Sequence, residues 1–130
     1  MSQHSDSSRE VRNLTQAEHQ LTEWLLLQSG SKNHKYLAQL SDARVAGKCQ
    51  CGCASVDFSI TEKTPHRGAG LEILADYLWR SESGNLMGVF VFAQEEQLAG
   101  LEVWSVDGEE TPTELPTTEQ LIPFEEGRNA

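Results

Sequence analysis

Three cysteines stand at alternate positions near the middle of the chain, and they have the clearest potential for chemistry. They are Cys49, Cys51 and Cys53, all the cysteines in the sequence. With His66 or Asp57 as a fourth ligand, three thiolates would complete a zinc site. Zinc–sulfur bonds of about 2.3 Å bring ligand sulfurs within roughly 4 Å of each other, whereas alternate residues on a straight strand have Cα atoms about 6.6 Å apart. A zinc site therefore requires the backbone to turn, and Gly52 permits this.

A thiol-redox role and a structural role are the other interpretations of the cluster. The usual redox motif is C-x-x-C at a helix N-terminus, where the thiol pKa is lowered, but this C-x-C-x-C cluster precedes an alternating segment, residues 54–60. The apolar residues of that segment are even-numbered, so the cysteines continue its polar, odd-numbered face. A bulge at Gly52 would shift the register and return Cys49 and Cys51 to the core face. We favour the bulge; without it, three thiols face solvent together, which strengthens the zinc and redox interpretations.

Tryptophans and carboxylates supply a second set of candidates, for binding another protein. Tryptophan anchors many interfaces, and an acidic sheet surface suits a basic partner. The residues that we select are Trp79, Trp104, Asp107, Glu109 and Glu110. The plainer interpretation is core packing for each tryptophan and a solvated surface for the carboxylates. The sequence has no phosphate-binding loop and no hydrolase or metalloprotease motif, so we identify no catalytic residue and favour a non-enzymatic class.

Acidic residues outnumber basic ones, which bears on the expected partners. There are 20 Asp and Glu against 10 Lys and Arg, a formal net charge of −10. Such a surface repels phosphate backbones, so nucleic acid is not an expected partner. It attracts basic proteins, although an acidic balance is also a common route to plain solubility, which is the simpler interpretation. No apolar run approaches the roughly 20 residues of a membrane span, and the start of the chain has no apolar signal-peptide core. We expect a cytoplasmic protein that does not bind membranes.

The elements that position these residues begin with two helices. Thr15 and Glu18 have the spacing of a capping box, in which each side chain binds the other residue's free backbone N–H. The helix that follows has an apolar stripe at helical spacing and ends at Gly30. A second helix is predicted from Asn33, as its cap, to about Ala43.

Four strands are predicted after the helices, because the apolar period changes to two. They cover residues 54–60, 71–79, 86–93 and 98–106. The third is apolar on both faces, which indicates a central position. The sequence thus predicts an α+β fold, with two N-terminal helices packed on a four-stranded, mainly antiparallel meander sheet. We expect one domain over residues 14–124, between a disordered N-terminal tail, 1–13, and a C-terminal tail, 125–130.

Three segments resemble those of a group of small bacterial proteins with a C-x-C-G-C stretch, for which no activity is established. The segments are Leu14–Glu18, Ala43–Asp57 and Leu98–Gly108. In that group a helical start leads into the cysteine stretch and a strand, and a later Gly-Leu-Glu-Val-aromatic strand ends in Asp-Gly. The resemblance implies a bacterial, cytoplasmic protein and brings no catalytic residues with it.

The leading hypothesis is a non-enzymatic acidic domain, without a cofactor, that binds another protein. Its most concrete form is an immunity or inhibitor protein that neutralises a basic toxin through electrostatic complementarity. The alternative is a metal-binding or thiol-redox protein that uses the cysteine cluster, with zinc as the cofactor. No feature of the sequence indicates the oligomeric state.

Overall fold

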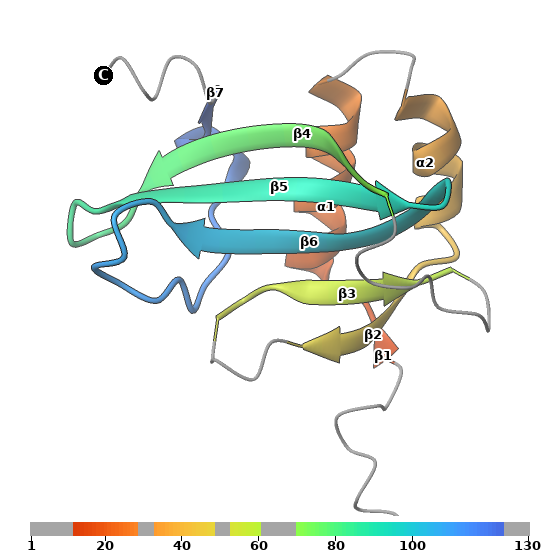
Figure 1. Ribbon diagram of the computed structural model, residues 1–130, viewed down its shortest axis with the longest axis horizontal. Coiled ribbons are helices and arrows are strands. Elements are labelled where there is room, and N and C mark those ends of the chain that lie inside the picture. Colours follow the sequence, from red (N-terminus) through yellow and green to blue (C-terminus); the bar gives the residue numbers. More distant parts are fainter. Residues whose placement is uncertain (1–11, 29–32, 49–52, 61–69, 124–130) are drawn as a thin grey trace, which may run out of the picture.

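The computed structural model describes residues 12–28, 33–48, 53–60 and 70–123, and in this part of the chain two α-helices pack on one antiparallel sheet (Figure 1). The strands are ordered β1-β2-β3-β6-β5-β4-β7. In chain order the elements are β1 (Arg12–Asn13), α1 (Gln16–Gln28), α2 (His34–Leu40), β2 (Arg44–Lys48), β3 (Val56–Ser59), β4 (Leu71–Arg80), β5 (Leu86–Gln94), β6 (Gln97–Ser105), the 3₁₀ helix η3 (Thr118–Gln120) and β7 (Ile122–Pro123). The α+β class is confirmed, but the described sheet has seven strands and not four.

The meander of β4, β5 and β6 is the part of the sheet that the sequence predicts best. β4 pairs with β5 along its length, and β5 pairs with β6 in the same way. β5 therefore lies between the other two, which confirms the central position predicted from its apolar residues. The meander stops there, because β3 pairs with β6 and not with β4. The expected four-strand order is wrong in this respect.

Hydrophobic periodicity does not predict the other three strands, which are short or irregular. In β2 only Val45 is an apolar residue fully buried in the core, and a shift of register between Val45 and Gly47 interrupts the alternation. β1 and β7 have two residues each, too few for any period to appear. β1 also lies inside the segment expected to be an N-terminal tail. These two strands form because the sheet offers an edge with which they can pair.

The capping box predicted at the start of α1 is confirmed, and a third residue joins it. The Thr15 backbone N–H donates to Oε1 of Glu18 at 2.9 Å, and the Glu18 backbone N–H donates to Oγ1 of Thr15 at 3.1 Å. Arg12 of β1 donates two further hydrogen bonds to the Glu18 carboxylate, at 3.0 and 2.9 Å. This carboxylate is nearly buried, with 8% of its side chain exposed. It therefore connects the first strand to the first helix.

The two α-helices cover one face of the sheet, and no other α-helix in the described part of the chain covers the opposite face (Figure 1). Leu21, Leu25 and Leu26 of α1 are buried in the same core cluster as Val89 and Val91 of β5. Burying one such side chain stabilises the fold by about 1.5–3 kcal/mol. The helix positions are thus set by apolar packing on the helix-facing side of the sheet.

The second helix begins at the predicted position but ends earlier than predicted, and its cap residue makes a different hydrogen bond. It ends at Leu40, before the expected limit at Ala43. Asn33 stands at the cap position, but its side chain makes no capping hydrogen bond. Instead, this buried side chain donates to the carbonyl of Leu74 at 3.3 Å. Leu74 lies at an irregularity of the β4–β5 pairing, between Ile73 and Ala75.

The turn between β5 and β6 has an uncommon backbone. Its two central residues, Glu95 and Glu96, have φ angles of 52° and 64°. Positive φ at both positions is typical of the tight two-residue hairpin turn. Such turns usually contain Asn-Gly, because most residues with a Cβ atom disfavour positive φ. Gln39 of α2 holds the turn through two hydrogen bonds. Its Nε2 group donates to the Glu96 carbonyl at 3.0 Å, and its Oε1 atom accepts from the Leu98 backbone N–H at 2.6 Å.

Candidate functional site

The sheet face opposite the helices is formed mainly by even-numbered residues of the central strands. Residues directly opposite each other on neighbouring strands share a face, so the pairings of β4, β5 and β6 define this helix-free face (Figure 1). Its members are Ile73, Asp76 and Leu78 of β4, Gly88, Phe90 and Phe92 of β5, and Gly100, Glu102 and Trp104 of β6, with Asp57 of β3 beside Gly100.

Two glycines on this face allow aromatic rings to lie close against the backbone. A Cβ atom on Gly88 would come within 2.5 Å of Cε2 of Trp104, and one on Gly100 within 2.6 Å of the Phe92 ring. Glycine inside a strand often marks such a close approach. Phe92 is buried and Trp104 is half-buried. The face is thus a packed aromatic layer, part of which is accessible to a partner.

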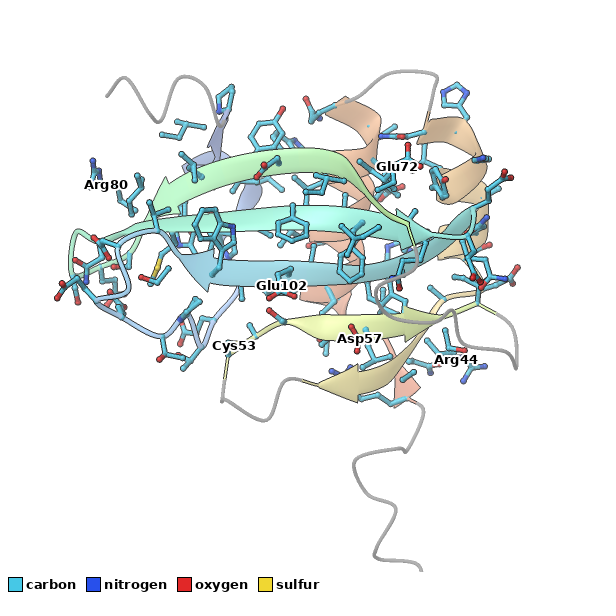
Figure 2. The ribbon with its side chains drawn as sticks, in the orientation of Figure 1. Arg44, Cys53, Asp57, Glu72, Arg80 and Glu102 are labelled. Carbon is cyan, nitrogen blue, oxygen red and sulfur yellow. The ribbon has the colours of Figure 1, made fainter. Side chains whose placement is uncertain are left out.

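An acid–aromatic row, formed by Asp76, Phe90 and Glu102, crosses the middle of this face. Asp76 lies opposite Phe90 in the β4–β5 pairing, and Phe90 lies opposite Glu102 in the β5–β6 pairing. The rings of Phe90 and Phe92 have centroids 5.8 Å apart. Figure 2 shows Glu102 and Asp57 on the near side of the sheet, with the helices behind it. Aromatic rings with carboxylates beside them attract cations through both charge and the ring quadrupole.

The surroundings of Asp76 are unfavourable for a charged carboxylate. Its side chain is half-buried, and no group in the described part of the chain donates a hydrogen bond to its buried Oδ1 atom. Burial disfavours the charged form and raises the pKa of Asp76 above its ordinary value. A positively charged donor would compensate for this lost hydration.

Replacing Asp76 with Asn is expected to stabilise the protein at pH 7 by about 1 kcal/mol, because a buried carboxylate without a donor is removed. A raised folded-state pKa means that the wild-type protein loses stability as the pH rises from the unfolded-state pKa of about 3.9 through the folded-state pKa. The advantage of Asp76→Asn should therefore be present at pH 7 and disappear below about pH 4. Urea unfolding at both pH values measures it. An equal gain in Glu72→Gln, at an exposed position on the same strand, would contradict the prediction.

Trp79 and Glu110 lie together, on a different side of the sheet from Trp104. Trp79 belongs to the helix-facing core and is 5% exposed. Both residues line a cavity of about 380 Å³ near the turn between β4 and β5. Glu110 accepts hydrogen bonds from Oγ of Ser81 at 2.7 Å and from the amide of Asn85 at 2.8 Å. Glu110 therefore attaches the C-terminal segment to this turn.

Asp107 and Glu109 are exposed in the segment after β6. Oδ1 of Asp107 accepts from Oγ of Ser105 at 3.3 Å and from the Glu109 backbone N–H at 3.1 Å. This local pattern is typical of a turn that begins with aspartate. Of the five residues selected from the sequence for protein binding, Trp104 is the one that belongs to the helix-free face.

Of the three cysteines in the cluster, Cys53 lies among the described residues. Cys53 is 7% exposed and packs in the helix-facing core. A regular strand would place it on the polar face, but β3 begins only at Val56, so the alternation does not extend back to it. The rest of the predicted set lies outside the described residues: Cys49, Cys51, Gly52 and His66. Within the described ranges no three His, Cys, Asp or Glu side chains gather as a metal site requires. The Gly52 bulge and the zinc site stay predictions.

Asp76, Phe90 and Glu102 were not selected from the sequence, although a signal for them exists. β5 is apolar on both faces, and one of those faces must therefore lie away from the helices. Glycines at 88 and 100, inside strands, mark where rings approach the backbone. Which residues share a row depends on strand register, which alternation alone does not supply.

No protein-family model, curated protein sequence or solved structure matches the chain. None of the described helices has both the length and the apolar character needed to cross a bilayer.

Proposed function

We propose that the chain is a non-enzymatic protein-binding domain whose helix-free face binds the basic surface of another protein. The observation that carries this proposal is the acid–aromatic row, in which two carboxylates flank a half-buried ring. Trp104 lies half-exposed on the same face. Tryptophan and phenylalanine are enriched in protein interfaces, and tryptophan often contributes much of the binding energy.

The edge of the face and the charge of the whole chain agree with this proposal. Leu71 and Ile73 of β4 are 50% and 49% exposed, an unusual exposure for large apolar side chains on a strand. Ile73 lies opposite Phe92, so it extends the apolar part of the face. The net charge of −10 would attract a basic partner and orient it before contact. An immunity or inhibitor protein that masks a basic toxin is the most specific form of the proposal.

Site-specific photocrosslinking tests this function. The photoreactive amino acid benzoylphenylalanine would replace Ile73 on the helix-free face or, as the control, Leu27 on α1, which is 54% exposed. In lysate from cells that express the protein naturally, at low salt, we expect Ile73 to crosslink to a basic protein and Leu27 not to. The adduct should decrease at high salt. No adduct at Ile73, or equal adducts at both positions, would contradict the proposal.

A further inference from the structure

The acid–aromatic row has dimensions that suit one particular side chain of a partner. Asp76, Phe90 and Glu102 come from three adjacent strands at the same level. Neighbouring strands are about 4.8 Å apart, so the two acidic residues have Cα atoms roughly 10 Å apart on either side of the ring. A planar cation stacked on the Phe90 ring would therefore have a carboxylate on each side of it.

Resting on the function proposed above, we propose that Asp76, Phe90 and Glu102 form a subsite for an arginine side chain of the partner. The guanidinium group is planar, stacks on aromatic rings and has five N–H donors in a fixed fork. It can contact Phe90 while it donates to carboxylates on two sides. A lysine ammonium is compact and strongly hydrated, and it matches this flat arrangement less well.

The surroundings of Asp76 favour such a ligand. Its Oδ1 atom is buried without a donor among the described residues, so the charge of this carboxylate is poorly compensated, and an arginine bound on the ring would place a positive charge beside it. The arginine nearest along the same strand, Arg80, is engaged elsewhere: its Nη1 atom donates to the Gly84 carbonyl at 3.0 Å. The other arginines of the described sheet lie beyond β3: Arg44 is on β2 (Figure 2), and Arg12 is on β1, where it binds Glu18.

Hexa-arginine and hexalysine peptides are the probes for this subsite. Titrated into the full chain at low salt, hexa-arginine should bind at least about fivefold more tightly than hexalysine. Asp76→Asn and Glu102→Gln should each weaken hexa-arginine binding about tenfold, and Phe90→Leu about fivefold. Glu72→Gln is the matched control, because it removes the same charge from an exposed residue of β4 whose cross-strand partner, Ala93, belongs to the core. It should weaken binding less than about twofold.

Equal losses in all three acidic variants would overturn the subsite, because general attraction to an acidic protein produces that result. Equal affinity for the two peptides would overturn it as well. Asp76→Asn is expected to be more stable than the wild type, so its loss of binding does not arise from unfolding.

Adding Asp76→Asn to the Ile73 crosslinking protein separates the two proposals. A basic adduct that persists unchanged contradicts the subsite alone, whereas no adduct without the substitution contradicts the proposed function itself.

Discussion

Replacing Gly100 with alanine is expected to lower the free energy of unfolding by about 3 kcal/mol, at the upper end for one added methyl group. The new Cβ would lie 2.7 Å from the Val56 carbonyl oxygen and 2.6 Å from the Phe92 ring. The ring can rotate, but the carbonyl belongs to the backbone of β3. Described pairing between β3 and β6 covers only Val56↔Leu101 and Asp57↔Gly100. Making room at Gly100 therefore disturbs one of the two described residue pairs between β3 and β6.

Thermal and urea unfolding measure this effect, and Gly47→Ala is its control. Gly47 also lies in a strand, but the nearest atom to its added Cβ is Oδ2 of Asp57 at 3.8 Å, an ordinary contact distance. We expect Gly100→Ala to lower Tm by about 10 °C and Gly47→Ala to leave it unchanged or slightly raised, since alanine loses less backbone entropy than glycine. Similar losses at both positions would show that close packing at Gly100 is not the cause.

Replacing Arg12 with alanine is expected to lower the stability by about 2 kcal/mol at pH 7, because it leaves the nearly buried Glu18 carboxylate without its cation. Burial alone raises the pKa of Glu18, but the hydrogen bonds from Arg12 and Thr15 outweigh it, so the net pKa lies below the ordinary value of 4.5. A depressed folded-state pKa contributes stability above the unfolded-state pKa and loses it as the pH falls through the folded-state pKa. The difference between wild type and Arg12→Ala should therefore shrink below pH 4.5.

Urea unfolding at pH 7, 5 and 3 checks both the size and the sign of this effect. Lys35→Ala is the comparison, because its ion pair with Glu96 joins side chains that are 53% and 84% exposed. It should give no measurable loss of stability at any of these pH values. A loss in Arg12→Ala that is as large at pH 3 as at pH 7 would mean that packing of Arg12, and not its charge, stabilises the start of α1.

Local patterns in the sequence predict the parts of this fold that depend on neighbouring residues. Thr15 and Glu18 are three positions apart, and the capping box that this spacing predicts is confirmed. The β4–β5–β6 meander follows from alternation and short turns. Arg12 was missed because its bond to Glu18 joins a two-residue strand to a helix. Strands this short show no hydrophobic alternation, and they form only by pairing with the edge of the sheet.

The candidate site was harder to predict than the fold because it depends on register. The sequence predicts Trp104 as an anchor for a partner, and Trp104 lies on the helix-free face. Phe90 was not predicted, since its neighbours Asp76 and Glu102 are 14 and 12 positions away and meet it only when three strands align. The alternation of residues 54–60 predicts Cys53 on the polar face. This prediction is wrong, because β3 begins only at Val56 and the alternation does not apply before it.

The turn between β5 and β6 has a consequence for the order in which the chain folds. Two residues with positive φ cost about 1–2 kcal/mol each, so this hairpin gains little help from its own turn when it begins to close. The residue that holds the turn, Gln39 of α2, lies 57 positions before Glu96. Contacts over such a separation form slowly. Strand β6 should thus join the sheet only when α2 has docked, which makes the helix-free face one of the last surfaces to be completed during folding.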